Sequence, residues 1–178
     1  MTLEAATAAD VERIVALVES AFRGDASRAG WTTEADLLDG RRTGPDEIAA
    51  ILANPAQCIL LEREPDGRLL ASVVLRRDGE AAWLGMLSVR PVAQGGGIGR
   101  RVVAGAEDWV RRHWGSRRMR MTVIVQRTEL IAWYERRGYR ATGETAPFYY
   151  GDPRFGLPKR NDLSFIVLEK PLDAPAPG

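Results

Sequence analysis

Four of the five residues from 95 to 99 are glycine, and no other feature of the sequence restricts fold and function as strongly. This glycine run lies between an apolar segment that ends at Val89 and an amphipathic segment that begins near Ile98. Glycine lets the backbone approach a ligand closely and turn its amide groups toward it. Aligned peptide dipoles add partial positive charge where a helix begins. A strand, a glycine loop and a helix in this order therefore predict a binding site for an anion such as a phosphate.

Two familiar phosphate-binding motifs do not fit the glycine run. A P-loop ends in Gly-Lys-Ser or Gly-Lys-Thr, whereas this run continues into Arg100 and Arg101. A dinucleotide fingerprint that starts at Gly97 needs a third glycine where the chain has Val102. It also needs an acidic residue about 20 residues further on, where the chain has Arg117 and Arg118. The preceding strands are joined by tight hairpin turns, which makes them antiparallel and unlike a Rossmann half. A flexible glycine turn without a ligand is the plain alternative.

Hydrophobic periodicity divides the chain into helical and extended segments. Helices are expected over 7–22, 33–38, 45–53, 98–114 and 127–137, and strands over 57–63, 68–77, 81–89, 117–125, 139–144 and 162–169. The pair Thr7 and Asp10 resembles a capping box, and Pro45 suits the first turn of a helix. This order predicts one α/β domain over residues 1–170, with a flexible tail rich in proline and alanine at 171–178.

Composition excludes several classes of protein. A chain of 178 residues that is 45% hydrophobic and 28% charged suits one globular domain. Its net charge of +1 gives no reason to expect nucleic acid or a membrane surface as a partner. The single cysteine, Cys58, excludes an internal disulfide, and with the single histidine, His113, it leaves no metal site to expect. Because neither a targeting segment nor a membrane-spanning run is recognisable, we expect a cytoplasmic protein.

Two motifs together resemble those of the GCN5-related N-acetyltransferase (GNAT) family. The first is Gln94-x-x-Gly97-x-Gly99, which follows a strand ending in the sequence Leu-Ser-Val-Arg-Pro at 87–91. The second is Trp-Tyr-Glu-Arg-Arg-Gly-Tyr at 133–139. The order of elements is similar over nearly the whole chain. The resemblance implies a single-domain α/β fold of the GNAT type, in which a mixed, mostly antiparallel central sheet splays open at the acyl-CoA site and is flanked by helices.

The same resemblance implies that acetyl-CoA is the co-substrate. Its pantetheine arm would lie in the opening of the sheet, against backbone groups of Leu87, Ser88 and Val89. Its pyrophosphate would be held by the amides around the glycine run, at Gln94, Gly95, Gly96, Gly97, Gly99 and Arg100. The anion site expected from the glycine loop falls at the same place. Arg101 fits an additional charge for the pyrophosphate and a solvated side chain of a first helical turn equally well.

Tyr134 matches the position of the general acid that the family usually has. A phenol with a pKa near 10 stays protonated at neutral pH and can protonate a leaving thiolate. A core tyrosine that packs beside Trp133 is the alternative interpretation. The family motif usually carries asparagine seven residues earlier, where this chain has Arg127. The difference puts in doubt the contact that the asparagine makes and leaves the tyrosine assignment intact.

The sequence leaves the general base open. Many members of the family carry a glutamate on the strand before the glycine loop, but the matching stretch from Leu84 to Leu87 has no carboxylate. The amine would then lose its proton through ordered water and backbone carbonyls, or to a residue elsewhere in the chain. Glu144 and Asp162 are candidates for that residue, although both also fit solvated carboxylates at strand ends.

The sequence as a whole predicts an acetyl-CoA-dependent N-acetyltransferase that acetylates a primary amine by direct attack within a ternary complex. The acceptor can be a small molecule, a peptide N-terminus or a lysine side chain, and no metal, nucleic acid or membrane is expected to take part. The segments 22–31 and 145–161, with Phe148, Tyr149, Tyr150 and Phe155, are expected to shape the acceptor pocket. The family also implies a homodimer. A catalytically inactive CoA-binding regulatory module is the alternative from a different class.

Overall fold

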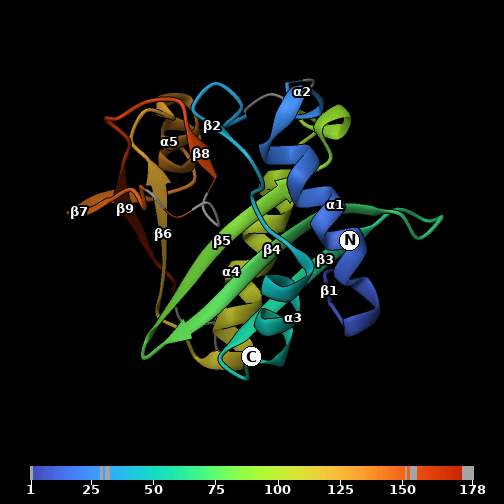
Figure 1. The fold of residues 1–178 in the computed structure, drawn as a ribbon. Coiled ribbons are helices and arrows are strands. Elements are labelled where there is room, and N and C mark those ends of the chain that lie inside the picture. Colours follow the sequence, from blue (N-terminus) through green and yellow to red (C-terminus); the bar gives the residue numbers. More distant parts are fainter. Residues whose placement is uncertain (1, 29, 31–32, 151, 153–155, 174–178) are drawn as a thin grey trace.

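The computed structural model describes residues 2–28, 30, 33–150, 152 and 156–173. Residues 174–178 of the expected tail therefore lie outside the described residues, as do parts of the two segments expected to shape the acceptor pocket, including Phe155. The described residues form a central sheet with a layer of helices on each face (Figure 1).

The central sheet has seven strands in the order β1-β3-β4-β5-β6-β9-β7. The strands are β1 (Glu4–Ala5), β3 (Gln57–Arg63), β4 (Leu69–Asp78), β5 (Ala81–Val89), β6 (Arg118–Ile124), β7 (Arg140–Pro147) and β9 (Ser164–Pro171). Every neighbouring pair is antiparallel except β5 and β6, which run parallel. The expected mixed, mostly antiparallel sheet is confirmed.

Helices cover both faces of this sheet. They are the 3-10 turns η1 (Ala8–Asp10) and η2 (Pro91–Ala93) and the α-helices α1 (Val11–Phe22), α2 (Gly24–Ser27), α3 (Pro45–Ala53), α4 (Ile98–Trp114) and α5 (Thr128–Glu135). Buried residues of α1 and α3 form one apolar cluster with β3 and β4. Those of α4 form a second cluster, on the opposite face, with β4, β5 and β6. The glycine loop therefore leads into a helix that is packed firmly on the core.

Local sequence signals explain where several helices begin and end. The capping box at the start of the first helical segment is present, because Thr7 N donates to Asp10 Oδ2 over 3.0 Å. Pro45 occupies the first turn of α3. α4 ends at Gly115, whose φ of 65° is the left-handed conformation that glycine adopts without a steric penalty. The buried stripe of α4 consists of Val102, Val103, Ala106 and Val110.

Two expectations from the sequence require correction. The segment 33–38 does not form a helix: it forms turns and the start of β2 (Leu38–Asp39), which pairs with the distant β8 (Leu157–Pro158). The folded part also extends past residue 170, because β9 includes Pro171 and Leu172 is buried against the core. The backbone amide of Leu172 donates to Arg117 O over 2.8 Å, which ties this end of the chain to the start of β6.

The sheet opens between β5 and β6. The two strands pair only where Ala81–Trp83 faces Arg118–Arg120, at one end of each strand. From there they diverge, as the green and orange strands in Figure 1 show. Backbone groups on this side of β5 beyond Trp83 therefore have no neighbouring strand to pair with. This opening is the splay that the sequence resemblance implied.

A bulge in β5 lies beside the opening. Ser72 of β4 faces Ser88, whereas Val74 faces Gly85, so β5 has one residue more than β4 between these pairs. Met86 lies in this stretch with a φ of 43°. Among the described residues, it is the one residue other than glycine that has a positive φ. Backbone strain of this kind costs roughly 1–3 kcal/mol and concentrates at functional sites. The bulge changes the direction of the β5 backbone where the cavity described below is lined.

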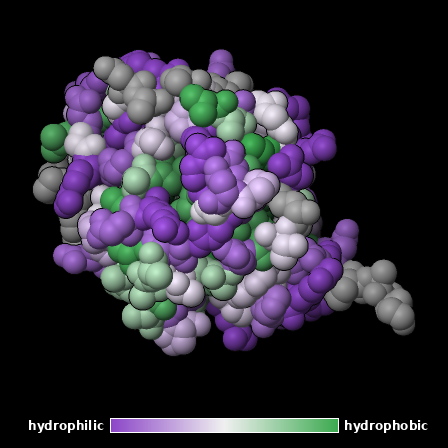
Figure 2. Space-filling model, turned by 90° about the vertical axis from the view of Figure 1, so that its right-hand side faces the viewer, coloured by the Kyte–Doolittle hydropathy of each residue, from purple (hydrophilic) through white to green (hydrophobic). Residues whose placement is uncertain are grey.

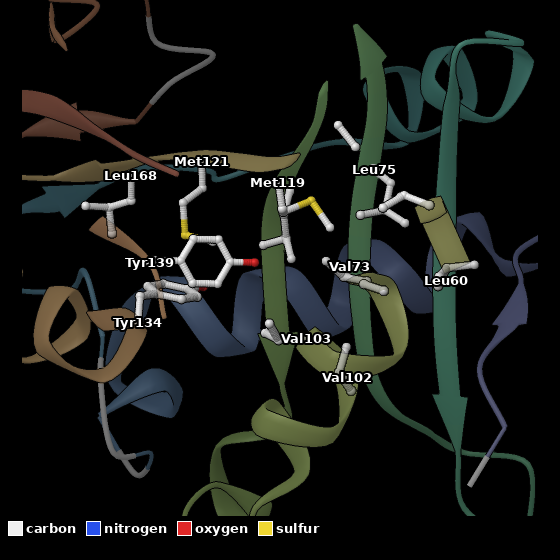
Figure 3. Close-up of a cluster of buried hydrophobic side chains, with 14 of the residues drawn as sticks. Leu60, Val73, Leu75, Val102, Val103, Met119, Met121, Tyr134, Tyr139 and Leu168 are labelled. Atoms are coloured by element: carbon white, nitrogen blue, oxygen red, sulfur yellow. The ribbon is translucent and has the colours of Figure 1, made fainter. Parts of the chain in front are cut away.

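The core is continuous behind the opening. Figure 3 shows Tyr134 and Tyr139 beside Met121 and Leu168, with Val103 of α4 beneath β5.

The face of the molecule in Figure 2 is mostly hydrophilic, and apolar side chains reach its surface only in small patches. Among the described residues, no helix combines the length and the apolar character needed to cross a membrane.

Candidate active site

A cavity of about 800 Å³ occupies the opening between β5 and β6. Its walls come from the end of α1, the segment around β2, the second half of β5, the glycine loop, β6, α5 and the region where β7 ends. Among the described residues that line it, six are arginines (Arg23, Arg42, Arg100, Arg127, Arg136 and Arg137) and two are glutamates (Glu34 and Glu47). The side chains of the lining thus carry a formal charge of +4, which suits an anionic ligand.

The glycine loop has the geometry of an anion site. Gly97 is the N-cap of α4 and has a φ of 78°, a conformation that side-chain-bearing residues rarely adopt. Gly99 packs closely against α5, because a Cβ atom at this position would lie 3.4 Å from the Trp133 ring. Gln94 anchors the loop by donating from Nε2 to Val89 O over 3.0 Å. Gly97, Gly99 and Arg100 line the cavity, so the first turn of α4, whose backbone amides have no partner within the helix, lies at the cavity.

Three arginines gather near the glycine loop. Arg100 is in the first turn of α4, and Arg136 and Arg137 follow α5. The pKa of Arg137 is lowered by burial and by the positive charges of Arg136 and Arg100, so the three charges lie close enough to repel one another. In the described part of the chain no carboxylate forms an ion pair with any of the three. The Arg137 guanidinium lies 3.8 Å from the centroid of the Trp133 ring.

Tyr134 lines the same cavity and is buried. Its exposed fraction is 4%, and its ring makes edge contacts with Trp133 and Tyr139. Burial raises the pKa of Tyr134 to about 12, against the opposing effect of the positive charges of Arg127 and Arg137. The phenol therefore keeps its proton throughout the physiological pH range. A protonated hydroxyl in a cavity beside an anion site can act as a proton donor.

A buried ion triad closes another part of the cavity. The Glu34 carboxylate pairs with Arg23 at the end of α1 and, over 3.1 Å, with Arg127 at the start of α5. All three side chains are less than 10% exposed. Burial opposes the charge of Glu34, but the positive charges of Arg127, Arg23 and Arg42 hold its pKa below the usual value. The triad joins three segments that are far apart in the sequence.

A comparison of sequences assigns the chain to a family. The family model described as "Acetyltransferase (GNAT) family" matches residues 12–139, which span the glycine loop and Tyr134. The chain belongs to the GNAT acetyltransferase family. A search of curated protein sequences finds no significant match.

Solved structures of GNAT acetyltransferases share the fold. The ribosomal-protein-S18-alanine N-acetyltransferase from Escherichia coli is 15% identical, with a TM-score of 0.71 over 98% of this chain and 96% of that one. A variant of the spermidine N-acetyltransferase SpeG from Vibrio cholerae is 15% identical, with a TM-score of 0.67 over 97% and 95% of the two chains. Nourseothricin acetyltransferase is 20% identical, with a TM-score of 0.57 over 67% of each chain. At these identities the likeness establishes the GNAT fold and no particular acceptor.

The structure brings most of the expected CoA-binding residues to one place. The cavity is lined by Leu87, Val89, Gln94, Gly95, Gly97, Gly99 and Arg100. Ser88 and Gly96 are not among its lining residues. The side chain of Ser88 is fully buried and its hydroxyl donates to Met86 O over 3.0 Å, so only its backbone remains as a ligand group. Arg101 bridges the glycine loop and β3, because Nη1 donates to Gly96 O over 3.5 Å and Nη2 lies 3.4 Å from Glu62 Oε1.

The two carboxylates considered as bases lie elsewhere. Glu144 on β7 is exposed and pairs with Arg120, and Asp162 precedes β9 and pairs with Arg160 over 2.6 Å. Neither lines the cavity that contains Tyr134. The carboxylates that do line it are Glu34 and Glu47, which the sequence did not single out. Glu34 lies in an irregular segment before β2, and Glu47 is one of two acidic residues in the first turn of α3, so no catalytic motif marks either of them.

The other titratable residues discussed from the sequence have structural roles. His113 stacks on Trp109 at the end of α4, with 4.3 Å between the ring centroids. Burial raises the pKa of the Cys58 thiol, which packs beside the core and is therefore a poor nucleophile. Among the described residues, no three His, Cys, Asp or Glu side chains lie close enough together to hold a metal ion.

Proposed function

We propose that this GNAT protein transfers an acetyl group from acetyl-CoA directly to a primary amine, with Tyr134 as the general acid. The observation that carries the proposal is the position of Tyr134. A buried, protonated phenol lines the same cavity as the glycine loop and the unpaired edge of β5. Anion binding and proton donation thus meet in one site, which is the combination that acyl transfer from CoA requires.

The residues present fit acetyl-CoA, which the family uses as its co-substrate. Pyrophosphate would be held by the amides of Gly95, Gly97 and Gly99, because the start of α4 offers unpaired N–H groups and the positive end of a helix dipole. The mutually repelling Arg100, Arg136 and Arg137 would be stabilised by the phosphates. The pantetheine arm would bind to the open edge of β5, with Leu87 and Val89 contributing backbone groups.

Acetyl-CoA supplies an acetyl thioester when it is bound. The amine nitrogen attacks the thioester carbonyl carbon, a C–N bond forms, and the C–S bond breaks. A backbone N–H of the bulged part of β5 can stabilise the oxyanion that develops during the attack. Tyr134 gives its proton to the departing thiolate and regains a proton from solvent. The step needs no covalent intermediate on the protein.

Proton removal from the amine is assigned to water. Glu34 is a poor base, because two arginines hold its pKa low. Glu47 lines the cavity, but it is exposed to solvent in the first turn of α3. We infer that the attacking amine loses its proton to ordered water and backbone carbonyls along β5. Glu144 and Asp162 keep only the status of sequence candidates, outside the cavity lining.

The acceptor is a primary amine of a small molecule or of a peptide. Proteins with this fold include one named for the alanine of ribosomal protein S18 and one named for spermidine, so the fold itself serves both acceptor types. A cytoplasmic enzyme that forms a homodimer remains the expectation from the sequence.

The test is thiol release on mixing acetyl-CoA with a panel of amines. Release that depends on the amine, together with an acceptor heavier by one acetyl group, would support the proposal. The competing function is an inactive CoA-binding module. Tight CoA binding by calorimetry without amine-dependent thiol release would favour that module and contradict the proposal.

A further inference from the structure

One end of the cavity has an unusual combination of walls. Apolar side chains from three elements line it: Phe22 at the end of α1, Leu38 in β2, and Phe148, Tyr149 and Phe165 where β7 ends and β9 begins. Arg23, Glu34, Arg42 and Arg127 lie among them. We call this region the acceptor end. It is built from segments other than the glycine loop, so it is available to a second substrate.

Arg42 differs from the other two arginines of the acceptor end. Arg23 and Arg127 both pair with Glu34, as described above. In the described part of the chain no carboxylate lies within ion-pair distance of the Arg42 guanidinium, although it lines the cavity. Its observed side-chain contact is with the Phe22 ring, whose centroid lies 5.3 Å away.

The backbone around Arg42 is held in place. Glu19 Oε1 accepts hydrogen bonds from Arg42 N over 2.5 Å and from Thr43 N over 2.8 Å. The guanidinium lies within cation–π distance of the Phe22 ring. A guanidinium whose backbone is anchored, and which has no carboxylate partner among the described residues, is suited to bind a ligand carboxylate through two hydrogen bonds.

Arg42 is partly removed from solvent and has charges of both signs around it. Burial and the positive charge of Arg23 lower the pKa of Arg42, while Glu34, Glu47 and Glu19 act in the opposite direction. Glu34 already serves two arginines, and Glu47 is outside ion-pair distance of Arg42. A partly desolvated cation without a partner is costly, so a ligand carboxylate would stabilise it.

We propose that Arg42 binds a carboxylate of the acceptor, and that the acceptor is an α-amino acid with an apolar side chain. This inference rests on the proposed acetyl transfer to a primary amine. The carboxylate would contact the Arg42 guanidinium, and the apolar side chain would pack on the aromatic wall of Phe148, Tyr149 and Phe165. A polyamine would bring further positive charge to the acceptor end, where Arg23, Arg42 and Arg127 outnumber the lining carboxylates Glu34 and Glu47.

Matched acceptors test the proposal. Phenylalanine is compared with 2-phenylethylamine, and leucine with 3-methylbutylamine, because each pair differs only by the carboxylate. Values of kcat/KM are expressed per unprotonated amine, which removes the difference in amine pKa. The amino acids should be better substrates by about 10–100-fold, the effect of one charged hydrogen-bonding contact. Equal values within each pair would overturn the carboxylate assignment.

Variants then assign the preference to Arg42. Arg42→Gln should raise KM for the amino acids by about 10–100-fold and reduce the preference within each pair to near unity. Arg42→Lys should restore only part of it, because an ammonium group cannot bind a carboxylate in the same bidentate way. Arg41→Gln removes the neighbouring exposed arginine, which does not line the cavity, and should keep the full preference. A full preference in Arg42→Gln would overturn the proposal.

A binding measurement separates failure of this inference from failure of the proposed function. N-acetylphenylalanine and N-(2-phenylethyl)acetamide are titrated by calorimetry into the protein with CoA present. Tighter binding of N-acetylphenylalanine than of the amide, with the difference lost in Arg42→Gln, would support the anion site. If no amine in the panel is acetylated at the same time, only the proposed acetyltransferase activity is overturned. Turnover of all the amines, with equal binding of the two products, would overturn only the anion site.

Discussion

Tyr134 keeps its proton at neutral pH because burial raises its pKa to about 12, and its ring packs against the rings of Trp133 and Tyr139. Tyr134→Phe removes the hydroxyl and keeps the ring, so we expect kcat to fall by about 10²-fold, the lower end for a lost general acid. Affinity for CoA should change little. Tyr139→Phe is the matched control: its hydroxyl donates to Glu107 over 2.8 Å, and the ring is outside the cavity lining. Equal kcat values for Tyr134→Phe and the wild type, with chemistry rate-limiting, would contradict the assignment.

The pH profile tests the assignment of proton removal to water. Without a tuned base, kcat/KM should rise with pH toward the pKa of the acceptor amine and should shift with that pKa between acceptors. Tyr134 should cause no fall below about pH 10, because its raised pKa keeps the phenol neutral until pH approaches 12. The measurement covers roughly pH 6–10 with two amines of different pKa. Glu144→Gln, Asp162→Asn and Glu47→Gln should preserve the shape, and a limb that disappears in one of them would identify a base.

The glycine loop can be tested at the scale of an element. Gly97→Asp places a carboxylate at the N-cap of α4, where the pyrophosphate is expected, so affinity for CoA should fall by about 10-fold or more. The same change also strains a residue whose φ is 78°. Gly67→Asp provides the control, since Gly67 lies in an exposed turn with a φ of 85°. Calorimetry that gives both variants the affinity of the wild type would remove the loop from the CoA site.

The ion triad holds three elements together, and its loss should be measurable as stability. Glu34→Gln leaves Arg23 and Arg127 buried without their counter-charge, so we expect the free energy of unfolding to fall by about 3 kcal/mol. Urea denaturation provides the value. Glu47→Gln, at an exposed position on α3, should change it by less than about 0.5 kcal/mol. Similar stabilities for these two variants would mean that the triad contributes little.

Elements with strong local signals could be predicted from the sequence, whereas those that depend on distant partners could not. The helix at Pro45–Ala53 has the predicted bounds, because proline at its start and Asn54-Pro55 at its end act locally. The segment 33–38 was expected to be helical but leads into β2, whose partner β8 lies more than a hundred residues later. Propensity cannot anticipate such a pairing.

The candidate site divides in the same way. The glycine loop and Tyr134 belong to contiguous motifs, and the cavity contains both. Glu34 and Arg42 stand in an irregular segment where polar residues form no pattern. Glu34 acquires its role through Arg127, which is 93 positions away in the sequence. Only tertiary packing brings these charges together, so the spacing of residues in the sequence could not predict that Glu34 and Arg42 line the cavity.

At the scale of the whole molecule, the two parts of the proposed active site come from two halves of one sheet. Strands β1, β3, β4 and β5 carry α1, α3 and α4, while β6, β9 and β7 adjoin α5, and the cavity lies where the halves separate. The parallel contact at Ala81–Trp83 keeps the two halves joined at one end. One half thus supplies the glycine loop and the other supplies Tyr134. The opening is therefore a consequence of sheet topology.

A crystal structure of the protein with CoA tests this account most directly. The account predicts pyrophosphate at the amides of the glycine loop and pantetheine along the open edge of β5. It also predicts the CoA sulfur within about 3.5 Å of the Tyr134 hydroxyl, the reach of a proton donor. CoA bound outside the opening between β5 and β6, or a sulfur atom remote from Tyr134, would contradict it.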